Sequence, residues 1–159
     1  MNTVYLLLGS NIGDSFGHLS AAKKNIEKKF GMLLNASGIY KTAAWGDINQ
    51  PPFLNQILIA ETDFSAQQTI THILSIEKEM GRIRSKKNAP RIIDIDILFF
   101  NNDIIRTPDL VVPHPEIQNR RFVLVPLNEV SPYFIHPILQ KTPAELLNEC
   151  ADKLNVQKI

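Results

Sequence analysis

The chain has 159 residues, of which 44% are hydrophobic and 21% are charged, as is usual for a globular protein. This length corresponds to one ordinary domain that buries its own core, so we predict a single domain over residues 1–159. The formal net charge of +1 excludes an overall basic surface for nucleic acid or an anionic membrane. Any anion site must therefore be a local cluster of basic residues.

Cys150 is the single cysteine of the sequence, which precludes an intramolecular disulfide and fits a reducing compartment. The apolar run Val4–Leu8 is too short for the core of a signal peptide and has no basic leader. No stretch approaches the roughly 20 apolar residues of a membrane helix. We therefore expect a cytoplasmic protein that uses neither membrane nor nucleic acid as a partner.

The first third of the chain predicts strand, helix and strand. Val4–Leu8 is a buried strand that ends in a Gly-Ser-Asn turn. Apolar residues at helical spacing predict a helix over Phe16–Phe30, with Ser15 as its N-cap and Gly31 as its end. Met32–Thr42 is predicted as one strand, because Tyr40 and Thr42 at its end are residue types that favour β-structure.

The middle of the chain repeats this pattern. Ala43–Pro52 is a loop, and Phe53–Thr62 is a strand. Ser65 is expected to cap a helix that reaches Met80. The basic segment Arg82–Arg91 is almost free of apolar residues, so we expect a solvated loop.

The run Ile92–Phe100 is the strongest strand signal in the sequence. A turn at residues 101–103 predicts a hairpin that returns through Ile104 and Ile105.

The last third predicts helices. Val111–Phe122 is irregular with a short helix after Pro115, and Phe122–Val130 is apolar enough to pack beneath the sheet. A capping box with proline opens a C-terminal helix at Thr142. The order strand–helix–strand–strand–helix–strand is typical of an α+β sandwich, in which helices pack on one face of an antiparallel sheet.

Asp94 and Asp96 are the sharpest chemical feature. Residues two apart on a strand point the same way, so Ile93, Ile95 and Ile97 then face the core. Two adjacent carboxylates repel each other unless a cation lies between them, and Mg²⁺ takes one or two carboxylates together with phosphate oxygens. The alternative is the polar outer face of an edge strand.

Basic residues stand just upstream of this acidic pair: Arg82, Arg84, Lys86, Lys87 and Arg91. The guanidinium group suits phosphate geometry, so beside a metal site this segment indicates a phosphate clamp or lid. An ordinary solvated loop is the alternative.

Two further pairs could contact a nucleotide substrate. His114, held between prolines, and Arg120 could donate to a polyphosphate, although a lone histidine is more often structural. Phe53 and Phe122 could stack a flat heterocycle, although core packing is the commoner role of an aromatic ring. The chain has neither a P-loop nor a G-x-G-x-x-G pattern.

Together these residues resemble the 6-hydroxymethyl-7,8-dihydropterin pyrophosphokinase family, from about Val4 to about Pro137. Most specific is P-R-x-x-D-x-D-I followed by V-P-H-P and N-R-x-F. The matching segments are LLLGSNIGD (6–14), IYKTAAWG (39–46), QPPFLN (50–55), EKEMGRIR (77–84), PRIIDIDILFF (90–100) and VPHPEIQNRRFVLVPL (112–127).

The resemblance implies a reaction and a fold. Members of this family transfer a pyrophosphoryl group from ATP to the hydroxymethyl group of a reduced pterin, releasing AMP, in folate biosynthesis. It implies ATP and the pterin as substrates, two Mg²⁺ ions, a monomer, and a ferredoxin-like α+β sandwich with helices packed on the faces of an antiparallel sheet.

The resemblance also implies a role for each matching position. Asp94 and Asp96 would bind the metal ions, and Asp96 is the candidate for assisting proton removal. The implied catalytic clamp consists of Arg82 and Arg91. The ATP-binding positions would be Glu77, Arg84, His114 and Arg120. The pterin-binding positions would be Thr42, Ala43, Trp45, Phe53, Asn55 and Phe122.

Three other functions remain open at this level. A ferredoxin-like RNA-binding module would have a basic surface and an uncharged sheet face, which this chain lacks. A structural metal-binding protein would not need the arginine-rich segment. A catalytically weak pterin- or nucleotide-binding relative is the closest alternative, although the expected acidic and arginine positions are all present.

Overall fold

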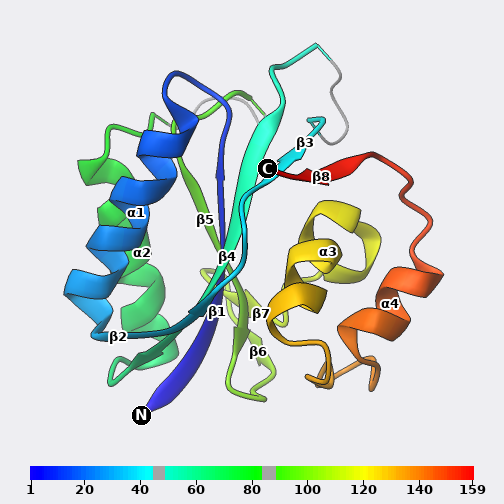
Figure 1. Ribbon diagram of the computed structural model, residues 1–159. Coiled ribbons are helices and arrows are strands. Elements are labelled where there is room, and N and C mark those ends of the chain that lie inside the picture. The colour runs from blue at the N-terminus through cyan, green and yellow to red at the C-terminus, as the bar shows by residue number, and fades with distance from the viewer. Residues whose placement is uncertain (45–48, 84–88) are drawn as a thin grey trace.

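The computed structural model describes residues 1–44, 49–83 and 89–159. Figure 1 shows its elements around one sheet. In chain order they are β1 (Asn2–Ser10), α1 (Ser15–Phe30), β2 (Met32–Ala36), β3 (Tyr40–Thr42), β4 (Phe53–Thr62), α2 (Ala66–Glu79), β5 (Asp94–Phe100), β6 (Ile105–Arg106), β7 (Val111–Val112), the 3-10 turn η1 (Ile117–Asn119), α3 (Arg121–Val130), α4 (Pro143–Glu149) and β8 (Val156–Lys158).

The main sheet has the strand order β5-β1-β4-β3-β8, and β2 also pairs with β4. Every pairing in it is antiparallel, with Leu6 of β1 opposite Leu58 of β4 and Ile97 of β5. β1 and β4 are long and almost wholly buried, because helices lie on both sides of them. Each central strand therefore contains an apolar run, Val4–Leu8 in β1 and Ile57–Ala60 in β4.

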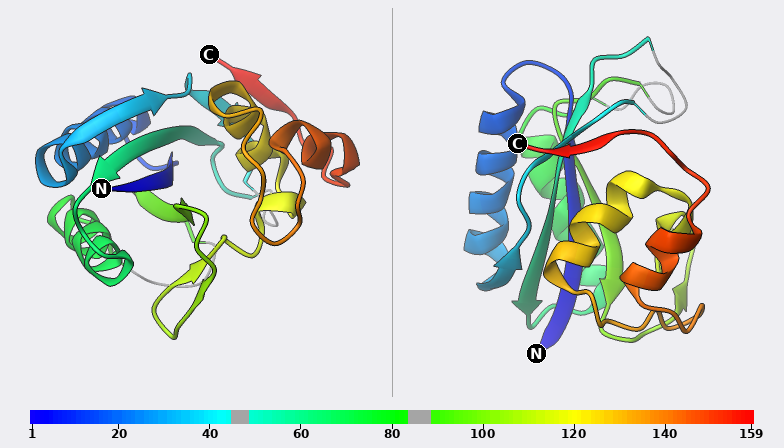
Figure 2. Two further views of the ribbon diagram at one scale, coloured as in Figure 1. Left: turned by 90° about the horizontal axis from the view of Figure 1, so that it is seen from below. Right: turned by 45° about the vertical axis from the view of Figure 1, so that its right-hand side comes forward.

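Side-chain alternation along β1 divides the core into two layers. Val4, Leu6 and Leu8 join the cluster beneath α1 and α2, whereas Tyr5 and Leu7 join the cluster beneath α3 and α4. The two helix pairs lie on opposite sides of the sheet in Figures 1 and 2. The ferredoxin-like α+β prediction is thus confirmed, but with helices on both faces rather than the one face that the element order favoured.

The start of α1 differs from its prediction. Asp14, not Ser15, is the N-cap, because its carboxylate accepts a hydrogen bond from the backbone N–H of Gly17 at 3.1 Å. Ser15 is instead the first helical residue. The predicted end is confirmed: Gly31 has a φ of 115°, a conformation that favours glycine.

The predicted strand Met32–Thr42 is two strands. β2 and β3 are separated at Ser37, whose backbone N–H donates to the Ile57 carbonyl and whose hydroxyl accepts from the Ile57 N–H. The Ser37 hydroxyl takes the place of the backbone carbonyl that would accept this bond in a regular sheet. The chain therefore bends at Ser37 but stays hydrogen-bonded to β4. Such a contact depends on a partner 20 residues away.

The predicted hairpin after β5 is also wrong. Ile105 pairs with Val112 in a separate two-stranded sheet, not with β5. The outer edge of β5 is occupied instead, since the backbone N–H of His114 donates to the Leu98 carbonyl at 2.9 Å.

The remaining helices agree with the sequence. A short 3-10 turn follows Pro115, α3 packs beneath the sheet, and Thr142 opens α4 with both bonds of a capping box. Within the described parts of the chain, no helix has the length and apolar character needed to cross a bilayer.

Candidate active site

The two aspartates lie side by side on the edge strand β5, as predicted. Ile93, Ile95 and Ile97 are buried in the core on the opposite side, which leaves Asp94 and Asp96 on one face. The side chain of Asp96 forms no hydrogen bond or ion pair with any residue that the structure describes. The pair therefore keeps at least one carboxylate for a ligand.

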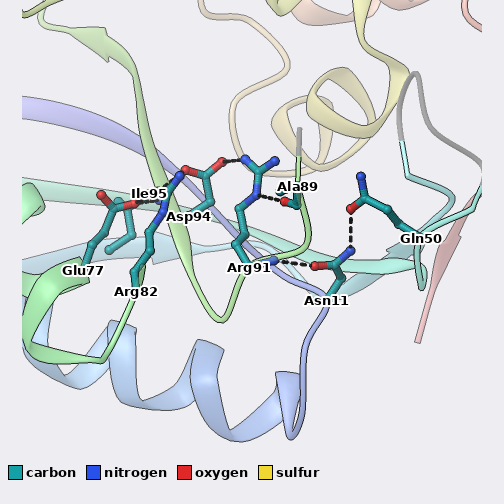
Figure 3. Close-up of polar contacts among 8 residues, drawn as sticks. All are labelled: Asn11, Gln50, Glu77, Arg82, Ala89, Arg91, Asp94 and Ile95. Carbon is teal, nitrogen blue, oxygen red and sulfur yellow. Dashed lines mark hydrogen bonds and ion pairs between the residues drawn. The ribbon is translucent and has the colours of Figure 1, made fainter. Parts of the chain in front are cut away.

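Asp94 is held by two arginines (Figure 3). Its Oδ1 accepts from Arg82 at 2.7 Å and its Oδ2 from Arg91 at 3.0 Å. Arg82 also forms an ion pair with Glu77, whose Oε2 accepts from the backbone N–H of Ile95 at 2.9 Å. These contacts of Glu77 and Arg82 thus fix the start of β5 against the end of α2.

The expectation of a solvated loop is wrong at both of its ends. The side chains of Arg82 and Arg91 are only 11% and 18% exposed. Their carboxylate partners compensate the loss of hydration, which a reading of local composition does not reveal.

Burial and charge shift the proton affinities of this cluster. Burial, reinforced by the charge of Asp94, raises the pKa of Asp96 to about 7. Burial also raises the pKa of Glu77, against the bonds from Ile95 and Arg82. For Arg82, burial lowers the pKa but Asp94 and Glu77 outweigh it, so the net pKa is raised. The arginine therefore stays charged among the carboxylates.

One hollow lies beside the aspartates, between the ends of β1, β3 and β4 and the start of α3. It gathers nine of the predicted site residues: Thr42, Ala43, Phe53, Asn55, Arg91, Asp94, Asp96, Arg120 and Phe122. Gly9, Gln50 and Leu7 also line it. Residues that are far apart in the sequence thus line one hollow.

A buried amide and two aromatic rings define the character of this hollow. Asn55 and Thr42 are each 3% exposed, and the Asn55 amide donates to the Thr42 hydroxyl at 2.9 Å. Arg91 lies 5.6 Å from the ring of Phe53, and Arg120 lies 5.8 Å from the ring of Phe122. A pocket with rings and an oriented amide suits a flat ligand with hydrogen-bonding edges.

A second hollow is lined by the same two aspartates. It is lined by Asp94 and Asp96 together with His114, Glu77, Asp109 and the apolar residues Ile70, Leu74, Ile97, Leu110 and Val111. The two hollows thus share the carboxylate pair. A group transferred between two ligands would pass over these carboxylates.

His114 is neutral and has a defined tautomer. Burial, then the charge of Arg120, lowers its pKa below the usual range. Its Nδ1 accepts a hydrogen bond from the backbone N–H of Glu116 at 3.1 Å. The proton is therefore on Nε2, which is available as a donor.

Two predicted site residues, Arg84 and Trp45, lie outside the described residues, as do Lys86 and Lys87 of the basic segment. Gly9, Asn11 and Gln50 were not among the predicted site residues. The Gly9–Asn11 turn resembles a phosphate-binding turn in outline, but such a turn without a P-loop pattern is too unspecific to predict site residues.

A family model described as 7,8-dihydro-6-hydroxymethylpterin-pyrophosphokinase matches residues 5–132. The chain belongs to this family. One relative is the 2-amino-4-hydroxy-6-hydroxymethyldihydropteridine pyrophosphokinase of Aquifex aeolicus. It is 43% identical over 149 residues, which cover 94% of this chain and 92% of the relative. The enzyme of the same name from Methylorubrum extorquens is 39% identical over 133 residues, covering 83% and 84%.

Longer proteins also contain this pyrophosphokinase family region. The folic acid synthesis protein FOL1 of Dictyostelium discoideum is 40% identical over 141 residues, which cover 89% of this chain but 21% of that protein. A crystal structure of Plasmodium falciparum HPPK-DHPS aligns with a TM-score of 0.76 at 19% identity, over 94% of this chain and 43% of that one. This structural likeness supports the fold alone.

Proposed function

We propose that this chain transfers a pyrophosphoryl group from ATP to the hydroxymethyl group of 6-hydroxymethyl-7,8-dihydropterin, yielding the pterin diphosphate and AMP in folate biosynthesis. The observation that carries the proposal is the position of Asp94 and Asp96 between two hollows of different chemistry. Family membership supports the same reaction. We further propose that residues 1–159 act as one domain and as a monomer.

Asp94 and Asp96 would hold Mg²⁺. The donor set fits this ion, because two carboxylates on one strand face leave the other coordination positions to substrate phosphates. No third acidic, histidine or cysteine ligand joins them among residues 1–44, 49–83 and 89–159. When bound, the ion neutralises phosphate charge and activates the attacking hydroxyl. We expect two ions, following the family.

Arg82 and Arg91 would exchange partners on substrate binding. In this structure their guanidinium groups contact Asp94, at 2.7 and 3.0 Å. A polyphosphate offers both guanidinium groups an equivalent anion, which frees Asp94 for the cation. The arginines would then stabilise the charge that develops on the transferred group. By the family resemblance, Arg84 would join them.

The aromatic hollow would bind the pterin. Phe53 and Phe122 supply ring faces, and the Thr42 bond leaves one N–H and the oxygen of the Asn55 amide for the pterin edge. Ala43 lines the same wall, and Trp45 is assigned to it by resemblance. The second hollow would bind ATP, with His114 Nε2 as a phosphate contact and with Glu77 positioning Arg82. Arg120 lines the first hollow and would contact the phosphates from that side.

Asp96 is the carboxylate that we assign to proton removal from the hydroxyl group. It lines the hollow proposed for the pterin, where the hydroxyl group would lie. Positioning and charge stabilisation would supply most of the acceleration in any case.

The test is an assay of the purified protein with ATP, Mg²⁺ and 6-hydroxymethyl-7,8-dihydropterin, in which AMP is distinguished from ADP. We expect AMP only when pterin and metal are both present, and a loss of at least ~100-fold in Asp94→Ala and Asp96→Ala. Asp103→Ala, beyond the far end of β5 and exposed, is the matched control and should keep full activity. ADP as product, or AMP formation that survives in both variants, would contradict the proposal.

The alternative function, a catalytically weak pterin- or nucleotide-binding relative, has a distinct outcome in this experiment. Both ligands would bind to the wild-type protein, with nucleotide binding dependent on Mg²⁺, but no AMP would form.

A further inference from the structure

Asn11 joins two separate segments, at Arg91 and at Gln50–Pro51, to the end of β1. It follows β1 and is 5% exposed. Its backbone N–H donates to the Arg91 carbonyl at 3.1 Å, and its Oδ1 accepts from the Arg91 N–H at 2.9 Å. Its Nδ2 donates to Gln50 Oε1 and to the Pro51 carbonyl, both at 3.1 Å. Figure 3 shows Asn11 between Arg91 and Gln50.

Asparagine is the residue type that these contacts require. The Arg91 backbone N–H is only a donor and the Pro51 carbonyl only an acceptor, so the amide orientation is fixed by its partners. A carboxylate could serve Arg91 but not Pro51. An aliphatic side chain would leave the Arg91 N–H and the Pro51 carbonyl without these bonds.

The segments that Asn11 joins carry residues of the hollow. Arg91 bonds to Asp94 through its side chain at 3.0 Å and lies over the Phe53 ring. Gln50 lines the hollow, and Pro51 leads into β4, which begins at Phe53. Asn11 itself does not line the hollow. It can therefore act on a ligand only through the segments that it holds.

We propose that Asn11 is a positioning residue that sets the width of the pterin pocket by tying the Arg91 segment to the Gln50–Pro51 segment. The proposal rests on the function proposed above. Its contacts lie on the pterin side, whereas the second hollow is lined from α2, β5 and the segment around His114. Loosening the tie should therefore weaken pterin binding more than nucleotide binding, which depends on these segments only through Arg91.

The variant that tests this is Asn11→Asp. It keeps the size and the acceptor for Arg91, removes the donor, and places a carboxylate oxygen against the Pro51 carbonyl. A flipped Gln50 amide could restore one bond, but Pro51 cannot donate. We expect the KM for pterin to rise at least ~10-fold while the KM for ATP stays within about twofold. Asn102→Asp, an exposed change in the turn after β5, is the matched control and should behave as wild type.

Direct binding keeps the test independent of catalysis. The Kd for pterin should be measured for each variant from the pterin fluorescence, and the Kd for a non-hydrolysable nucleotide should be measured in the presence of Mg²⁺. The melting temperature of each variant shows whether it is folded. Asn11→Ser, which is neutral and shorter, is a second variant, and we expect it to shift pterin affinity in the same direction.

Three outcomes would overturn the inference. The first is pterin affinity in folded Asn11→Asp and Asn11→Ser equal to that of wild type. The second is an equal loss of pterin and nucleotide affinity, which indicates a general structural role. The third is a wild-type protein that binds no pterin, in which case the proposed function is wrong and this inference falls with it.

Discussion

Asp96 makes the stability of the ligand-free protein depend on pH. Its folded pKa of about 7 exceeds the ordinary value of 3.8, so the folded state holds this proton more tightly than the unfolded state. Its contribution to stability is complete below about pH 4 and is lost as pH rises through about 7. In EDTA at pH 8, the free energy of unfolding of Asp96→Asn should therefore exceed that of wild type by roughly 2–4 kcal/mol. Near pH 4 the two proteins should have similar free energies of unfolding. Urea denaturation of both proteins at each pH measures this difference. A difference between variant and wild type that is the same at pH 4 and pH 8 would contradict the prediction.

The absence of a side chain at Gly9 leaves room for Asn55 and Phe53 in the pterin hollow. A Cβ at this position would lie 3.0 Å from Asn55 Oδ1 and 3.6 Å from the Phe53 ring. Gly9→Ala should therefore displace the Asn55 amide and raise the KM for pterin by roughly 10-fold, with the KM for ATP little changed. Steady-state kinetics with each substrate varied in turn measure the split. Equal KM values in variant and wild type would show that Asn55 does not contact the ligand.

At the scale of elements, Glu129 connects β3 to α3. The Tyr40 hydroxyl donates to Glu129 Oε1 at 2.6 Å, and Glu129 also accepts from the backbone N–H of Gly38. Burial, aided by Glu129, raises the pKa of Tyr40 to about 12, so the donor stays protonated. Tyr40→Phe should lower the free energy of unfolding by about 1 kcal/mol. Tyr133→Phe, at a tyrosine that is 88% exposed, is the control and should leave stability unchanged in the same denaturation experiment.

At the scale of the whole molecule, the layer formed by α3 and α4 must pack for the site to form, because α3 carries Phe122. Phe99 anchors this layer from β5: it is 2% exposed, and its ring lies 4.6 Å from Phe134 and 5.5 Å from Tyr5. Phe99→Ala should cost about 3–5 kcal/mol of unfolding free energy. Tyr133→Ala removes an exposed ring of similar size and should cost under about 0.5 kcal/mol. Similar losses in both variants would contradict this account of the core.

Local patterns alone determined much of this protein. Alternation along Ile92–Phe100 correctly placed Asp94 and Asp96 on one face, because a strand side chain takes its direction from its own backbone. The N-cap at Ser65 and the capping box at Thr142 were also predictable, since they involve residues three apart. The site motifs were recognisable because their residue types and spacing are specific in combination.

Only the tertiary structure decided how these pieces meet. Arg82 and Arg91 are part-buried on Asp94, β6 pairs with β7 rather than β5, and helices cover both faces of the sheet. Asn11 contacts residues 39 and 80 positions away in the chain. Each of these outcomes depends on the partner that the fold brings within reach, and local composition contains no information about a partner so distant in sequence.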